Sequence, residues 1–332
     1  MHTTQYFLAA LLFLMTTGCT KDFHIDRTQS KPLYVIDGRI SNMRGPYYIR
    51  ITKSDNQLNA STPGNVGLDS AEAVTGALVT MSDDVGLTDT LRLIDAIGLR
   101  YDYKYKDGKW DSTLSTDDYY EYKGVRGYYK STKIAGMPGH TYHLMVRIGS
   151  ETFEASAYMP PSVPSIDSIT LKKDPAADPS GRLGYAAFVS FAEPRDQQNY
   201  YMLTVHQTID YPYDQARGVY YNHWSFPVYT FDDKALPPYV NGMEVLSLIS
   251  SYTRVGPGRY KPVFFDKDWP SQVRLSALTR ETYEYFEAVQ QQFIADGNVF
   301  KPAPASAVGN ISGGALGLFW APNVSHKEVL PQ

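Results

Sequence analysis

The side chains that could bind a metal ion or transfer a proton are few and scattered along this sequence. His140 and His143 are three residues apart, so on a strand they would face opposite sides and could not easily share a metal ion. His206 and His223 have no adjacent ligand pattern. We therefore expect surface or loop-edge histidines, no metal site and no cofactor.

Adjacent carboxyl groups occur at Asp83-Asp84, Asp117-Asp118 and Asp232-Asp233. Neighbouring carboxylates on an extended chain diverge, whereas a general acid and base usually come from separate segments. Solvated turns are the expected structure; a loose surface Ca²⁺ site is the alternative, although no stretch matches an EF-hand loop. A serine nucleophile elbow and a His-Glu-x-x-His motif are both missing, so we predict no catalytic residue and no enzyme.

Cys19 is the only cysteine, so an internal disulfide cannot form. It follows an apolar run over residues 6–15, which has the length of a signal-peptide core and is too short to span a bilayer. The small residues at 16–18 resemble the lipobox, where a bacterial cysteine receives a diacylglyceryl group. We predict a signal peptide over 1–18, a lipid on Cys19 and a tether over 19–32. A buried cysteine behind an ordinary secretory signal is the alternative.

Tryptophan rings offer flat apolar faces that can stack on a sugar or another planar ligand. Trp224 and Trp269 lie in an irregular stretch rich in Tyr and Pro, 210–270, where loops could present them. Trp110 is a third candidate, and Trp320 is expected in the core. Packing beneath a long loop is the alternative for the three candidates.

Length and charge limit the classes of protein that this chain can represent. The 332 residues are enough for two domains of ordinary size. The formal net charge is -4, which implies no large field of one sign, so we do not expect nucleic acid as a partner.

Apolar and β-branched runs separated by turn residues predict a mainly β chain. Residues 33–40 suit a strand buried on both faces, and Asp107-Gly108 is a strong hairpin signal. The prolines at 160, 161 and 164 form a natural joint between domains. We predict an N-terminal β-sandwich over 33–161, a β-rich domain over 162–325 and a tail over 326–332.

One segment near 279–295 has the pattern of a helix. Thr279 could cap it, and Tyr283, Phe286, Val289 and Phe293 fall at helical spacing, as core contacts would. The glycine-rich stretch 310–320 follows, and it lacks both phosphate-loop spacings. We expect it to form a closing strand in which backbones approach closely.

Several segments together resemble a family of Bacteroidota lipoproteins known as domain of unknown function 4249. The matching segments, in family order, include 33–40 (LYVIDGRI), 127–129 (GYY), 136–142 (GMPGHTY), 156–161 (SAYMPP), 166–169 (IDSI), the helix from 279, and 310–320 (NISGGALGLFW). The resemblance implies an outer-membrane lipoprotein, often encoded near a TonB-dependent receptor, with a transthyretin-like or immunoglobulin-like N-terminal sandwich. It implies no catalytic residues.

The leading hypothesis is a non-enzymatic lipoprotein of the outer membrane, periplasmic or surface-exposed, that assists a TonB-dependent nutrient-uptake system. It would bind a small-molecule, peptide or glycan ligand, or dock at the receptor. A surface adhesion or structural lipoprotein is the alternative. A third hypothesis, an enzyme acting on glycans, requires two carboxylates that converge in a cleft about 5–10 Å apart.

Overall fold

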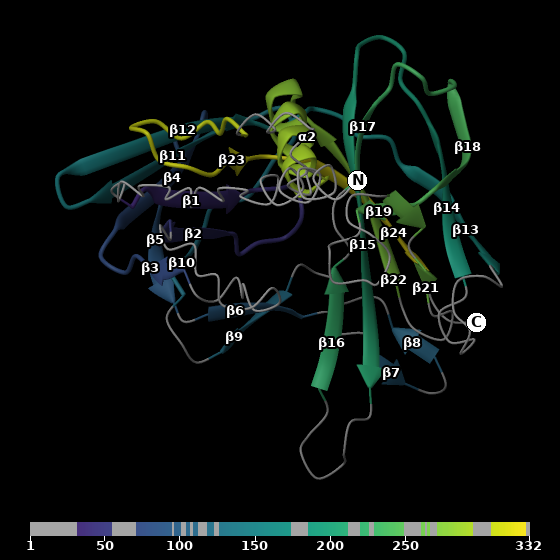
Figure 1. The fold of residues 1–332 in the computed structure, drawn as a ribbon, viewed down its shortest axis with the longest axis horizontal. Helices are drawn as coiled ribbons and strands as arrows, with labels where there is room; N and C mark the ends of the chain where they lie inside the picture. The colour runs from purple at the N-terminus through teal and green to yellow at the C-terminus, as the bar shows by residue number, and fades with distance from the viewer. Residues whose placement is uncertain are drawn as a thin grey trace, which may run out of the picture. The chain divides into compact units, whose positions relative to one another are not determined.

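The computed structural model of the protein (Figure 1) describes most of the chain after the predicted tether. The described residues are 32–54, 71–94, 96–100, 104–106, 109–111, 118–122, 126–173, 185–211, 220–225, 229–248, 260–262, 264–265, 271–294 and 307–329. The predicted signal peptide and Cys19 lie outside these residues.

Nine strands join in one hydrogen-bonded sheet, and eight of them come from the first half of the chain. They are β1 (Tyr34–Arg39), β2 (Tyr48–Lys53), β3 (Glu72–Ala73), β4 (Leu78–Asp83), β5 (Thr88–Ile94), β10 (Tyr128–Lys130), β11 (Thr141–Ile148), β12 (Glu151–Tyr158) and β23 (Phe319–Trp320). The main path runs β12-β11-β4-β5-β10-β2-β1-β23, with β3 beside β2.

The sheet changes direction at β5, so its two halves enclose one core. The first residues of β5 pair with β4, and Arg92 to Ile94 pair with β10. Side chains from both halves meet in the first hydrophobic core, which includes Ile36, Ile49, Ile51, Val79, Leu144 and Phe153. Alternate residues of these strands point inward, as the period of a half-buried strand requires.

A second set of nine strands forms two further sheets. The four-stranded sheet contains β13 (Ile166–Lys173), β14 (Tyr185–Ala192), β18 (Tyr239–Glu244) and β21 (Phe264–Phe265). The five-stranded sheet contains β15 (Tyr200–Tyr211), β16 (Tyr220–Ser225), β17 (Tyr229–Asp232), β22 (Ser271–Leu278) and β24 (Asn323–Val329). Phe191 of β14 meets Leu203 of β15 and Leu275 of β22 in a second hydrophobic core.

Three short antiparallel pairs complete the described strands. They are β6 (Ala96–Arg100) with β9 (Asp118–Tyr122), β7 (Lys104–Lys106) with β8 (Lys109–Asp111), and β19 (Leu246–Leu248) with β20 (Tyr260–Pro262). Lys106 lies opposite Lys109, which confirms the predicted hairpin, although Asp107 and Gly108 lie outside the described residues.

The described residues contain one α-helix, α2 (Arg280–Ile294), directly after β22. The Thr279 hydroxyl accepts a hydrogen bond from the Thr282 amide at 3.3 Å, so Thr279 is the predicted cap. Tyr283 stacks near Tyr200 of β15, and the Phe286 ring meets Trp320 of β23. The helix therefore contacts both the first and the second set of strands. The side chain of Phe293 lies outside the described residues.

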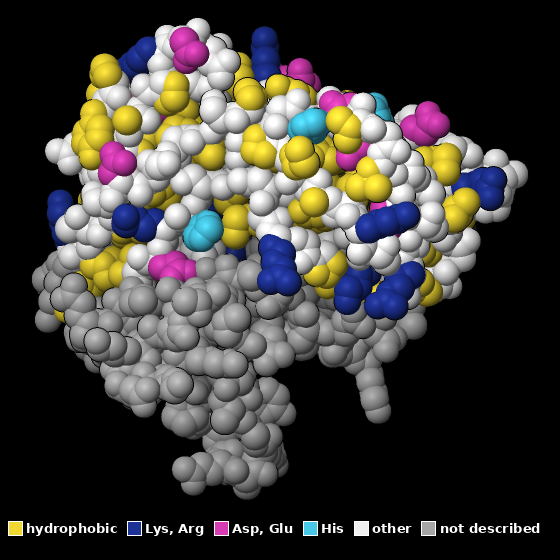
Figure 2. Space-filling view, turned by 180° about the vertical axis from the view of Figure 1, so that it is seen from behind, with side chains coloured by type: hydrophobic (Ala, Val, Ile, Leu, Met, Phe, Trp, Pro, Cys, Tyr) yellow, Lys and Arg dark blue, Asp and Glu magenta, His cyan; other side chains and the backbone are white. Residues whose placement is uncertain are grey.

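The prediction of a mainly β chain with one helix near its C-terminus is confirmed. The expectation that residues 33–40 are buried on both faces is wrong, because Ile36 is buried while Asp37 is exposed. Only the inner face of β1 meets the first core. Along one face of the molecule, acidic and basic side chains are interspersed with hydrophobic ones (Figure 2).

Candidate functional site

The chain closes its first sheet with a segment from the far end of the sequence, residues 307–321, here called the closing segment. Its strand β23 runs parallel to β1, with Phe319 opposite Gly38 and Trp320 opposite Arg39. A Cβ added at Gly317 would collide with the carbonyl oxygen of Ile36. This close backbone approach confirms the closing strand that the sequence predicts.

Asn310 ties the closing segment to the opposite edge of the sheet. Its side-chain amide nitrogen donates to the carbonyl oxygens of Ser156 at 2.9 Å and Phe319 at 2.7 Å. Its oxygen accepts a hydrogen bond from the Phe319 amide at 2.9 Å. Ser312 bonds the backbone of Glu154 in both directions, at 2.7 and 2.8 Å. The exposed edge of β12 is thereby covered.

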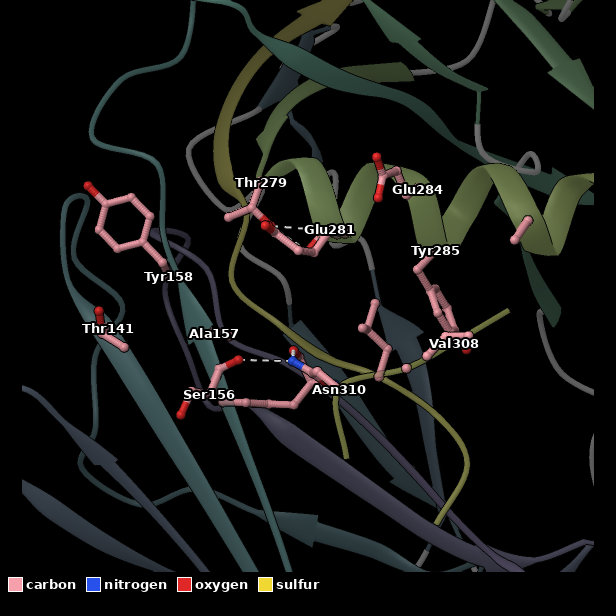
Figure 3. A pocket seen from close by; sticks show the side chains of 15 residues that line it. Thr141, Ser156, Ala157, Tyr158, Thr279, Glu281, Glu284, Tyr285, Val308 and Asn310 are labelled. Atoms are coloured by element: carbon pink, nitrogen blue, oxygen red, sulfur yellow. Dashed lines mark hydrogen bonds between the residues drawn. The ribbon is translucent and has the colours of Figure 1, made fainter. Parts of the chain in front are cut away.

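A groove of about 700 Å³ lies where β12, the closing segment and the start of α2 meet; we call it the helix groove (Figure 3). Its lining includes Thr141, Ser156, Ala157, Tyr158, Thr279, Glu281, Thr282, Glu284, Tyr285, Ala288, Val308, Gly309, Asn310, Leu318 and Phe319. Three segments distant in sequence thus build one concave surface, which is the usual form of a small-molecule site.

One face of α2 supplies a wall of the groove. Glu281, Glu284, Tyr285 and Ala288 recur at helical spacing and all line it. Glu284 pairs with Arg280 at 2.7 Å, whereas Glu281 is exposed. The wall is therefore negatively charged near the first turn and apolar farther along.

Tyrosines and an exposed valine are part of the lining of the groove. Tyr285 is half-buried, and burial raises the pKa of its hydroxyl, so the ring stays neutral at physiological pH. Figure 3 shows Tyr285 pointing from α2 toward the closing segment and Tyr158 across the groove. Val308 is 85% exposed, which leaves an apolar side chain open to an incoming ligand. The arrangement suits an amphipathic ligand that carries a positive charge.

His140 and His143 each contact a different polar side chain. His140 Nδ1 lies 2.7 Å from Asp84 Oδ1, while His143 Nδ1 lies 2.8 Å from the Ser156 hydroxyl. The hydrogen bond from the Thr141 amide and the one from His140 lower the pKa of Asp84. Among the described residues, groups of three or more His, Cys, Asp or Glu side chains that could hold a metal ion do not occur.

The acidic pairs differ from one another. Asp83 accepts hydrogen bonds from the amides of Val85 and Leu87 in a turn, as expected. The expectation of a solvated turn is wrong for Asp233, which is buried. Its carboxylate accepts a hydrogen bond from the Asn199 backbone amide at 2.8 Å, which replaces water as its partner. Asp117 and the side chain of Asp118 lie outside the described residues.

Glu193 and Asp233 are two carboxyl groups that share a hydrogen-bond donor. The Asn199 side chain donates to Glu193 Oε1 at 3.0 Å and to Asp233 Oδ2 at 3.1 Å. Tyr201 donates its hydroxyl to Glu193 Oε1 at 3.0 Å. Both carboxyl groups are buried, and neither lines the helix groove. The network joins two loops of the second core and does not match the open carboxylate pair of a glycosidase.

The tryptophans proposed for stacking cannot be placed as a site. Trp110 lies on β8 and Trp224 on β16, where its partner across the ladder is Gln207; their side chains and all of Trp269 lie outside the described residues. The aromatic side chains that line the helix groove are Tyr158, Tyr285 and Phe319. Sequence reasoning missed Tyr285, although its four-residue offset from Glu281 on a predicted helix was a usable signal.

Among the described residues, no helix combines the length and the apolar character that a bilayer crossing requires. His206 and His223 lie on β15 and β16, and their side chains are not described.

Comparison with models of known protein families identifies a family for this chain. The model of the family described as Domain of unknown function (DUF4249) matches residues 20–328, which is nearly the whole chain. No curated protein matches the sequence.

Proposed function

Because the chain belongs to the family of domain of unknown function DUF4249, we propose that it is a lipid-anchored envelope protein that assists a TonB-dependent outer-membrane receptor. In this proposal Cys19 carries the lipid, and the protein binds the nutrient before the receptor takes it up. The helix groove is the binding site, and the protein has no catalytic step of its own.

The observation that carries the proposal is the helix groove. It is concave, it has a volume of about 700 Å³, and tyrosines and apolar side chains from three segments line it. Glu281 places negative charge on one wall, where Glu284 is paired with Arg280. We infer a ligand with an apolar part and a positively charged group. The charged group would lie at the negatively charged first turn of α2, and the apolar part would contact the apolar side chains farther along the wall.

The groove carries no arrangement that favours the glycan-enzyme hypothesis. Its two carboxylates, Glu281 and Glu284, project from one helix face, and Glu284 is already paired with Arg280. A glycosidase needs its acid and its nucleophile or base on either side of the scissile bond. The covered edge of β12 likewise gives no support to adhesion by strand addition.

Co-purification tests the partner. The tagged full-length chain is isolated from solubilised outer membranes, and bound proteins are identified by mass spectrometry. We expect a TonB-dependent receptor to be recovered with the wild-type chain. Recovery of none would contradict the proposal.

Uptake of that receptor's substrate tests the groove. Ala288→Trp places a large ring in the helix groove, whereas Gln291→Trp makes the same change on an exposed helix position outside it. We expect Ala288→Trp to lower uptake at limiting substrate and Gln291→Trp to leave it unchanged, with receptor recovery equal for both. Equal uptake in the two variants would exclude the groove as the binding site.

A further inference from the structure

A second cavity, of about 600 Å³, lies at the end of β10 and away from the residues of the helix groove. We call it the basic pocket. Its lining comprises Gly45, Pro46, Arg92, Lys130, Ser131, Thr132, Lys133 and Ile134. The ionisable side chains in this lining are three cations, and no carboxylate belongs to it. This concentration of positive charge occurs on a chain whose formal net charge is -4.

Two of the cations are direct neighbours across the sheet. Arg92 of β5 lies opposite Lys130 of β10 in the antiparallel ladder, so both side chains leave the sheet on the same face. That face is the outer one, because the adjacent residues Leu91 and Tyr129 are buried in the first core. Two positively charged side chains therefore project from one face of the sheet at the pocket.

The third cation, Lys133, lies on a turn whose backbone is hydrogen-bonded to a buried carboxylate. Asp89 is fully buried and accepts hydrogen bonds from the amides of Thr132 at 2.7 Å, Lys133 at 2.8 Å and Ile134 at 3.1 Å. It also accepts the Thr132 hydroxyl at 2.6 Å. The backbone that carries Lys133 is therefore held in place before any ligand arrives, which lowers the entropic cost of binding.

The carboxylate beneath the turn offsets only one of the three positive charges in the lining. All four hydrogen bonds of Asp89 go to the turn itself, and its side chain is inaccessible to solvent. Within the part of the chain that the structure describes, the side chains of Arg92 and Lys133 form no ion pair. Both are exposed and available to a ligand.

We propose that the basic pocket binds a tetrahedral oxyanion, either a phosphate or a sulfate group. The planar guanidinium of Arg92 can donate two parallel hydrogen bonds to one oxyanion, while Lys130 and Lys133 add positive charge to the same lining. This site is separate from the helix groove and does not depend on the function proposed for it.

Isothermal titration of the purified full-length chain tests the proposal, with ionic strength held constant by chloride. One arm uses inorganic phosphate as the free anion, and the other uses dextran sulfate as a polymeric sulfate ester. We expect saturable binding in at least one arm. Binding of phosphate identifies a free-anion site, and binding of dextran sulfate alone identifies a site for an esterified anion.

Charge-neutralising variants locate the binding. Arg92→Gln and Lys133→Gln should each weaken the measured affinity by about tenfold, since each removes a charged partner. Arg147→Gln makes the same change of charge at an exposed position of β11 outside the pocket and should leave the affinity unchanged. The proposal is overturned if neither probe binds, or if Arg147→Gln weakens binding as much as the pocket variants do.

Discussion

Glu193 is a buried carboxyl group with one satisfied oxygen. Its Oε1 accepts hydrogen bonds from Tyr201 and Asn199, while Oε2 has no hydrogen-bond partner. Burial raises the pKa of this group, so the folded protein binds the proton more tightly than the unfolded chain does. The stability that comes from this tighter proton binding is therefore fully present below the unfolded pKa of about 4.3. It is lost as the pH rises through the folded-state pKa of Glu193.

Replacing this carboxyl group by an amide should stabilise the protein. Glu193→Gln keeps an oxygen for Tyr201 and Asn199 and removes the buried charge, so we expect about 1 kcal/mol of added stability at pH 7. The gain should vanish near pH 4, where the wild-type carboxyl is protonated. Urea unfolding at the two pH values measures both effects. Asp196→Asn, an exposed change in the same loop, should alter neither; a loss of stability in Glu193→Gln would refute the assignment.

Asp89 shows the opposite behaviour. Burial alone would raise its pKa, but the hydrogen bonds from Thr132, Lys133 and Ile134 outweigh burial and lower it. Its contribution is present above the unfolded pKa of about 3.9 and is lost as the pH falls through the folded pKa. Asp89→Asn should cost about 3 kcal/mol at pH 7, because the amide cannot serve all four donors.

Thr132→Val is a smaller change at the same hydrogen-bond network, and its loss of stability can be compared with that of Asp89→Asn. It removes only the hydroxyl that donates to Asp89 Oδ1, so we expect a loss of about 1 kcal/mol. Urea unfolding at pH 7 compares both variants with the wild type. Equal losses in the two variants would mean that the buried carboxylate does not organise the turn.

Individual residues were predictable where local spacing decides their role. Thr279 was recognisable as a cap because it directly precedes the helical pattern. Asp233 was not predictable, because its partner Asn199 lies 34 residues earlier and meets it only in the folded chain. The pairing of Arg92 with Lys130 depends in the same way on strand register across a long connection.

At the level of elements, the closing segment determines how the first sheet ends. Phe319 is fully buried in the first core, and Asn310 joins β23 to β12. Phe319→Ala should therefore destabilise the protein by about 3–5 kcal/mol, the usual cost of removing a buried ring. Hydrogen exchange should show lost amide protection in β1 and β12. Leu316→Ala, at a side chain that is 45% exposed, is the control; unchanged protection in Phe319→Ala would contradict this account.

The strands, the hairpin and the helix were predictable because each has a local signal. The period of two, the Asp-Gly turn and the helical stripe all lie within a few residues of one another. The helix groove was not predictable, because it exists only where β12, α2 and the closing segment meet. The parallel pairing of β23 with β1 joins residues about 280 positions apart in the sequence, and no local pattern encodes such a contact.

On the scale of the whole molecule, the first core contains residues from both ends of the described part of the chain. Ile311, Phe319 and Ala321 pack with the residues of β1 to β12. A fragment of residues 33–161, the predicted N-terminal domain, would leave this core open along β1 and β12. The boundary at 161 stays a prediction, and the structure indicates that such a fragment lacks part of its core.

Expression of that fragment tests the dependence. We expect residues 33–161 alone to lack a cooperative unfolding transition in urea, since the sheet edges and part of the core are exposed. Joining residues 307–321 to the fragment through a short linker should restore the transition, because Asn310 lies within 2.9 Å of Ser156 in the fold. Cooperative unfolding of the bare fragment would show that the closing segment is dispensable.

We propose that a lipid on Cys19 holds this β-rich protein in the cell envelope. Metabolic labelling with a fatty-acid analogue, read out on the purified chain, tests it directly. We expect label on the wild-type protein, an N-terminus beginning at Cys19, and no label on Cys19→Ala. Label that persists in Cys19→Ala, or a mature protein that keeps residues 1–18, would contradict the account.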